Sequence, residues 1–157
     1  MRKYGASPGT FVERQQPESN LHGPVPATGR KGVIRMKESI TMTLAMAARL
    51  SGLLALGSGV VGWAGYAVPL YIHIALGSLL IVAVWSLAFQ ARSVAAGLAR
   101  FAGAVGAFIP VVGLLQLRFQ LGEFQWVPQG LHLAAGLGGI AFAEILAKRI
   151  RLSMQTL

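Results

Sequence analysis

Two histidines are the residues in this 157-residue chain that are best suited to chemistry. His73 and His132 occur in the same short pattern, V-P-x-x-x-H-x-A-x-G, which begins at Val68 and again at Val127. Neutral imidazole is a common metal ligand in proteins, and it also exchanges protons near neutral pH. Because one pattern recurs after 59 residues, we expect the two side chains to share one site.

Each histidine lies just inside a predicted helix. Proline suits the first helical position, where its missing N–H would have no partner, so Pro69 and Pro128 are predicted to open two apolar helices. Each histidine then lies about one turn, or about 6 Å, below the start of its helix. The glycine four residues later, Gly77 or Gly136, falls on the same helix face, beneath the imidazole.

The composition is typical of a membrane protein. Hydrophobic residues make up 54% of the chain, charged residues make up 12%, and the mean hydropathy is +0.60. A soluble domain of this size needs more charge to cover its surface. The 14 Lys and Arg lie at the ends of apolar runs rather than on one helix face with interleaved aromatic residues, so we expect no nucleic-acid partner. The absence of cysteine excludes thiolate catalysis, disulfides and Cys-based metal sites.

Four apolar segments provide the helices that position the histidines. They cover residues 50–68, 69–91, 101–117 and 128–147, with a lead-in at residues 40–48. Each is near the roughly 20 residues that cross a bilayer, and a backbone in lipid must satisfy its own hydrogen bonds. The sequence therefore predicts an all-α integral membrane four-helix bundle over residues 40–151, followed by a cytoplasmic tail at residues 152–157.

Residues 1–39 hold four prolines and show no apolar period, which is typical of a disordered extension. Met36 directly precedes the apolar part of the chain and is predicted to be the natural start, which would make residues 1–35 dispensable. A regulatory tail is the alternative interpretation of this segment.

The cations predict how the bundle is oriented. Of the 14 Lys and Arg, all except Arg118 lie before the first segment, between the second and third, or after the fourth. Positive residues accumulate on the cytoplasmic side, so both termini are predicted to be cytoplasmic, in the cell inner membrane. The opposite loops carry an aromatic belt typical of a membrane interface: Trp63, Tyr66, Tyr71, Phe124 and Trp126.

Weaker repeats accompany the histidines. Arg49-Leu-Ser-Gly52 resembles Arg100-Phe-Ala-Gly103, and Val60-Val61-Gly62 matches Val111-Val112-Gly113, both at an offset of 51 residues. These matches predict a duplicated helical hairpin. The second and fourth helices would then run in the same direction, which places both histidines at one depth near the outer face.

A histidine within a membrane span is costly and by default marks a functional site. A simple hydrogen bond to a carbonyl is the alternative, but a matched pair favours ligation. A zinc or copper site usually needs a third or fourth donor, and the only acid away from the cytoplasmic edge is Glu123. Two histidines fit the axial positions of a haem iron, whose equatorial ligands come from the porphyrin. We therefore predict haem b held by His73 and His132, with Gly77 and Gly136 either making room for the macrocycle or packing helices.

The pattern H-x-x-x-G in the second and fourth helices of a four-helix unit resembles one half of the haem A synthase family, and it is similar to single-unit cytochrome b-type bundles. Members of the synthase family contain two such halves, each with paired histidines on haem-facing helices. The resemblance covers residues 49–151 and implies a haem-holding bundle. Two family features are absent: the Glu four residues before each histidine, where Pro69 and Pro128 stand, and an outer-loop cysteine pair.

The sequence thus favours a haem-b-binding membrane protein for electron transfer or haem handling. Its expected partners are the lipid bilayer, a redox protein or quinone, and further copies of the chain in an oligomer. The alternative is a haem-free small transporter or accessory subunit, in which the histidines bind protons or pack. Two further expectations concern single residues. Glu144 is predicted to pair with Lys148 one turn later, with a proton-relay carboxylate as the alternative, and Trp85 is predicted to pack or to contact lipid.

Overall fold

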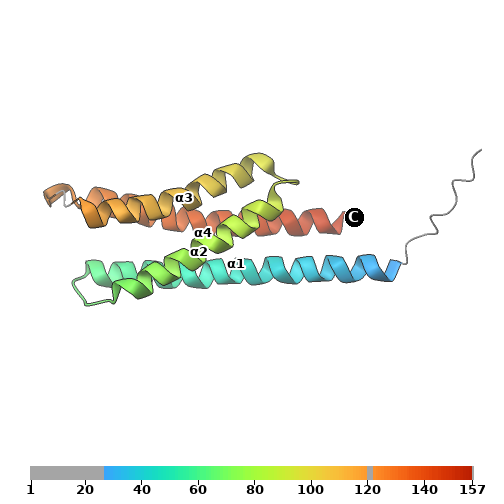
Figure 1. Cartoon of the computed structure of the whole chain (residues 1–157), viewed down its shortest axis with the longest axis horizontal. Coiled ribbons are helices and arrows are strands. Elements are labelled where there is room, and N and C mark those ends of the chain that lie inside the picture. Colours follow the sequence, from blue (N-terminus) through green and yellow to red (C-terminus); the bar gives the residue numbers. More distant parts are fainter. Residues whose placement is uncertain (1–26, 120–121, 157) are drawn as a thin grey trace, which may run out of the picture.

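The computed structural model describes residues 27–119 and 122–156 and contains four long helices that form two antiparallel hairpins (Figure 1). The helices are α1 (Ala27–Trp63), α2 (Leu70–Ala91), α3 (Ala96–Arg118) and α4 (Trp126–Gln155), with a short 3-10 helix, η1 (Gly122–Phe124), before α4. Each of the four is long and apolar enough to cross a membrane. The predicted all-α fold with four candidate membrane-spanning helices is therefore confirmed.

Helices α2 and α4 form the centre of the bundle. They contact each other, and each also packs against both α1 and α3. The α1–α2 and α3–α4 connections lie together at one end, which we call the loop end, and the α2–α3 connection lies toward the other, which we call the core end (Figure 1). The two helices that carry His73 and His132 are thus the two that touch all other helices.

The tightest packing lies toward the core end. Small residues there let the helices approach closely, as is common in membrane bundles. The buried cluster includes Ala83, Ala88, Ala91, Ala99, Ala102, Ala143 and Ala147, with Val84, Leu87 and Leu146 between them. Few buried residues lie in the outer turns of the helices, and Figure 1 shows the hairpins separating toward the loop end. The packing therefore leaves room for a site at the loop end.

Trp85 fixes α2 against α3. Its indole Nε1 donates to the Gly103 carbonyl at 3.1 Å. A Cβ atom at Gly106 would lie 2.7 Å from the same nitrogen, so the ring needs a glycine beneath it. Of the two predicted roles for Trp85, the structure therefore shows packing against a neighbouring helix.

Helix α1 begins much earlier than the composition predicted. Residues 27–39 are helical, so the prediction of disorder is wrong for them; residues 1–26 lie outside the described residues. No proline follows Pro26 in this stretch, and its Lys, Arg, Met and Glu residues are good helix formers. Once the apolar part of α1 is packed, extending the helix adds one hydrogen bond per residue without a new nucleus.

Several other helix ends differ from the predicted segments. Helix α1 ends at Trp63 instead of residue 68, because Gly65 (φ 88°) closes it with hydrogen bonds from Gly65 N to Gly62 O and from Tyr66 N to Val61 O. Helix α3 begins at residue 96 rather than 101. Helix α4 continues to residue 155, so the predicted C-terminal tail is mostly helix.

The ion pair predicted within α4 forms between helices instead. Arg49 of α1 donates from Nη2 and Nε to one Glu144 oxygen, at 2.7 and 3.0 Å. The predicted Glu144–Lys148 pair was based on residue spacing along one helix. Such spacing gives no information about cations on neighbouring helices, and here Arg49 of α1 lies within bonding distance of Glu144. The pair joins the first and last helices of the bundle.

Candidate functional site: a facing histidine pair

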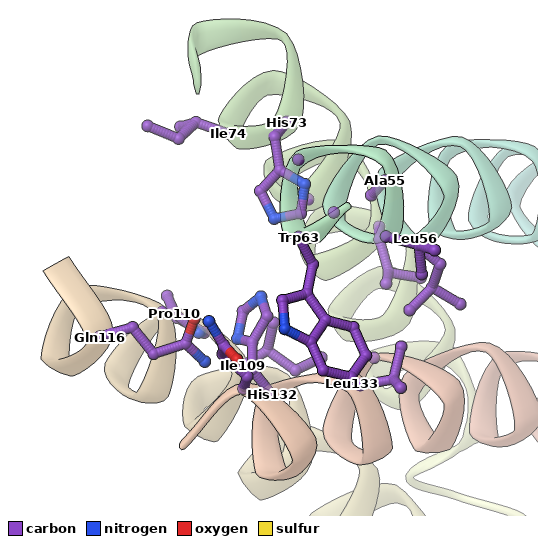
Figure 2. A pocket seen from close by; sticks show the side chains of 18 of the residues that line it. Ala55, Leu56, Trp63, His73, Ile74, Ile109, Pro110, Gln116, His132 and Leu133 are labelled. Carbon is purple, nitrogen blue, oxygen red and sulfur yellow. The ribbon is translucent and has the colours of Figure 1, made fainter. Parts of the chain in front are cut away.

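His73 on α2 and His132 on α4 lie opposite one another across the space between the hairpins (Figure 2). Their ring centroids are 5.9 Å apart, and the ring planes are tilted by 43°. Both side chains are half-buried. The structure thus brings together two residues that are 59 positions apart in the sequence.

The local start of each helix differs from the prediction. Pro69 is the N-cap of α2, so His73 is the fourth helical residue. Helix α4 begins at Trp126, which places Pro128 third and His132 seventh in the helix. Proline is still tolerated there, because the first four N–H groups of a helix have no partner in it. The rings nevertheless meet, so the two helices are offset along the bundle rather than matched from their first residues.

A cavity of about 610 Å³ surrounds the histidine pair. This volume falls within the range of roughly 300–1,000 Å³ that is usual for small-molecule and cofactor sites. All four helices contribute to a mostly apolar wall, which includes Leu56, Leu80, Ile81, Ile109, Leu114 and Leu133. The polar lining groups include the two imidazoles, Ser78, Gln116 and Gln129, and Trp63 and Trp126 also line the cavity.

Each imidazole packs against a glycine of the preceding helix. A Cβ atom at Gly59 of α1 would lie 3.4 Å from His73 Cε1, and one at Gly113 of α3 would lie 3.1 Å from His132 Cε1. The same type of contact thus occurs in both hairpins. It pairs Gly59 with Gly113, whereas the sequence repeat had aligned Gly62 with Gly113; Gly62 has nothing within 4 Å of its Cβ position.

Ser58 orients the His73 ring. The Ser58 hydroxyl lies 3.0 Å from His73 Nδ1 and donates its single proton to the Ala55 carbonyl at 2.8 Å. A hydroxyl that donates to Ala55 has only its lone pairs left for the ring, and this arrangement favours the tautomer with the proton on Nδ1 and a lone pair on Nε2. In Figure 2 one His73 nitrogen faces α1 and the other faces the space toward His132.

His132 has no equivalent support. Its Nδ1 is buried and forms no hydrogen bond among the described residues. The Ile109 backbone is close enough to interact with the ring, but no bond of normal geometry to Nδ1 results. Leaving a buried polar atom unpaired costs about 1–3 kcal/mol. Because Nδ1 forms no hydrogen bond, the His132 ring is held mainly by packing against Gly113.

The two glycines predicted beneath the histidines both line the cavity, but they differ in their surroundings. Nothing lies within 4 Å of the Cβ position of Gly77, so its helix face is open to the cavity. Gly136 is buried, and its Cβ position lies 3.3 Å from Leu56 Cδ2 of α1. Gly77 thus has the geometry expected for a cofactor-facing position, while Gly136 also serves helix packing.

Further contacts close the loop end of the cavity. The Gln116 side-chain amide donates to the Pro128 carbonyl, which ties α3 to the first turn of α4. The sequence offered no signal for Gln116, Ser58 or Gly59. Serine, glycine and glutamine are all common in helices. Their roles here depend on which face of the helix packs against the neighbouring helix. The one sequence feature that could have indicated Ser58 is the Ser58-Gly59 dipeptide near the end of the first apolar segment.

The histidine pair fits two of the ligands of a haem iron better than a protein-only metal site. Among the described residues, no group of three His, Cys, Asp or Glu side chains could hold a metal ion. An imidazole nitrogen lies about 2 Å from a bound transition metal and about 1 Å from its own ring centroid, so two rings on opposite sides of one ion have centroids about 6 Å apart. The 5.9 Å separation agrees with that spacing.

No protein-family model matches the chain, and no curated protein and no solved structure matches it either.

Proposed function

We propose that this chain is an integral membrane protein that binds haem b between α2 and α4, with His73 and His132 as the two axial ligands. The observation that carries the proposal is the pair of facing imidazoles, 5.9 Å apart, inside a largely apolar cavity. Paired histidines on two helices are a recurrent way to hold haem iron without further protein donors.

The lining residues support this cofactor by shape and polarity. The open helix face at Gly77 provides a flat surface against which a macrocycle can lie. Leucine and isoleucine side chains exclude water from the imidazoles, which lowers competition for the ligand positions. Gln116 and Gln129 provide hydrogen-bonding groups at the loop end for polar substituents of a ligand.

When bound, haem supplies one-electron chemistry through its iron. His73 and His132 would hold the iron as its two protein ligands, which would leave no iron position for a substrate. This arrangement favours electron transfer or haem handling over oxygen chemistry. A redox protein or a membrane quinone is the partner that such a carrier requires.

The proposal places the chain in the cell inner membrane with both termini in the cytoplasm and the loop end outside. Arg92 and Arg100 flank the α2–α3 connection, and Lys148, Arg149 and Arg151 occupy the end of α4, so cations concentrate at the core end. The aromatic residues of the loop end are 63–72% exposed, as expected for a belt at the membrane interface: Trp63, Tyr66, Tyr71, Phe124 and Trp126. Haem would then lie near the outer face.

The absorption spectrum of the purified protein tests the proposal. Protein from haem-replete cells should be red, with a Soret band and, on reduction, the sharp visible bands of a low-spin six-coordinate haem. A folded protein that purifies colourless and does not bind added haem would refute the proposal and favour a haem-free transporter or accessory subunit. A spectrum with an open axial position would refute paired ligation alone.

A further inference from the structure

The two histidines differ in the group that faces their second ring nitrogen. His73 Nδ1 is hydrogen-bonded to the Ser58 hydroxyl at 3.0 Å, whereas His132 Nδ1 is buried without a hydrogen bond among the described residues. The asymmetry is unexpected, because the two rings otherwise make equivalent contacts with Gly59 and Gly113.

Residue type explains the difference. Ser58 directly precedes Gly59, and Val112 directly precedes Gly113. Ser58 lies between the His73 ring and the Ala55 carbonyl, three residues earlier in α1. In the second hairpin, Ile109 occupies the position of Ala55, and the buried Val112 has no group that could accept a proton from the ring.

We infer that Ser58 is a positioning residue that makes His73 the tighter of two unequal axial ligands, while His132 is the weaker, exchangeable one. This inference rests on the proposed function. A hydrogen bond from the second ring nitrogen fixes the tautomer, limits rotation of the ring and makes the ligating nitrogen more basic. His73 receives all three effects through Ser58, whereas His132 has only the nearby Ile109 backbone, which forms no hydrogen bond of normal geometry to Nδ1.

Removing each ligand in turn tests the inequality. His132→Ala should retain haem on His73 as a five-coordinate species, with a high-spin spectrum. His73→Ala should lose most of its haem during purification, because the remaining ligand is the weaker one. Equal retention of haem by the two variants would overturn the inference, even if the wild-type protein binds haem through both histidines.

Changes at the two neighbouring positions test the cause. Loss of such a supporting contact typically costs about 10–100-fold in metal affinity, so Ser58→Ala should weaken haem binding by a factor in this range. Val112→Thr keeps nearly the same volume and adds a hydroxyl; it should strengthen binding and raise haem retention in the His73→Ala background. Matched controls are Ser86→Ala, a half-buried serine of α2 whose hydroxyl bonds to its own helix, and Val111→Thr, the exposed neighbour of Val112. Both controls should match the wild type.

A readout in the haem-free protein separates this inference from the proposed function. Nitrogen-15 NMR of the imidazoles should show His73 protonated at Nδ1, with the preference lost in Ser58→Ala and unchanged in Ser86→Ala. If wild-type protein binds no haem, the proposed function fails, and the unequal ligation fails with it. If wild-type protein binds haem but Ser58→Ala leaves both affinity and tautomer unchanged, only the role of Ser58 is refuted.

Discussion

Gly113 provides a sharp test of the site, because a single added carbon atom would meet a proposed ligand. In Gly113→Ala the new Cβ would lie 3.1 Å from His132 Cε1 and 3.5 Å from Nδ1. Ordinary contacts begin near 3.4 Å, so the ring or the helix must move by a few tenths of an ångström. Gly59→Ala places its Cβ 3.4 Å from His73 Cε1 and needs no such movement.

The displacement is a large fraction of the tolerance of a ligand site, which is roughly 0.5 Å. We therefore expect Gly113→Ala to weaken haem binding about tenfold, equivalent to about 1.4 kcal/mol. Gly59→Ala should change it by much less. Gly57→Ala is the matched control, because Gly57 is also a helical glycine, nothing lies within 4 Å of its Cβ position, and it does not line the cavity.

The assay is a titration of each purified, haem-free variant with haem, followed at the Soret band, together with its thermal unfolding. Alanine favours a helix over glycine by about 1 kcal/mol at an unhindered position, so Gly57→Ala should not be less stable than the wild type. If Gly113→Ala and Gly57→Ala bind haem equally well, His132 does not ligate from the position described.

Four further predictions concern the site and the arrangement of the chain. Both His73→Ala and His132→Ala should abolish the six-coordinate low-spin spectrum, while His22→Ala should leave it intact; a low-spin wild-type spectrum in either site variant would exclude that histidine as a ligand. Gly77→Leu, whose side chain would enter the open part of the cavity, should reduce the bound haem per protein measured by absorbance, and Gly136→Leu should reduce both haem and thermal stability because it also meets Leu56. A reporter fused after Leu157 should be active only in the cytoplasm; periplasmic activity would reverse the proposed orientation. A shortened chain that begins at Met36 should insert and show the wild-type elution profile in detergent, because Thr41 is the first buried residue in the part of α1 whose side chains are described, from residue 32 onward; aggregation of this chain would assign a structural role to the residues before it.

The fold was predictable because helices long enough to cross a membrane appear in a sequence as continuous apolar runs. Runs of apolar residues and prolines at helix starts were sufficient to predict four helices and to place the histidines on the second and fourth. The length of α1 was not predictable in this way. Residues 32–39, the part of this extension whose side chains are described, are exposed apart from the half-buried Ile34, so no apolar period marks them. Exposure does not prevent a helix from continuing out of a packed segment.

The candidate site was predictable only in part. A shared pattern identified His73 and His132, and the rings do meet. Their supports, Ser58 and Gly59, depend on the rotation of α1 against α2, which composition does not encode. The partner of Glu144 was mispredicted for the same reason. Spacing within α4 favoured Lys148, whereas the pair with Arg49 depends on how α1 packs against α4.

The distribution of polar groups through the bundle bears on the choice between electron carrier and transporter. His73 lies 18 residues, or about 27 Å, before the end of α2, and the cavity lining reaches Ile81, ten residues or about 15 Å from that end. A path for protons or ions across this distance would need polar side chains that face one another in the bundle. Among the residues whose burial is described, the buried polar side chains are Thr41 and Ser51. The Ser51 hydroxyl bonds to the Ala47 carbonyl of its own helix, whereas the Thr41 hydroxyl lies within bonding distance of both the Lys37 carbonyl and the Gln90 side-chain oxygen on α2, at 2.9 and 3.2 Å. The packed alanines and leucines between the cavity and the core end offer no such relay. The proposal of a haem site therefore rests on the facing imidazoles and their largely apolar cavity, and the Soret titration decides between haem carrier and transporter.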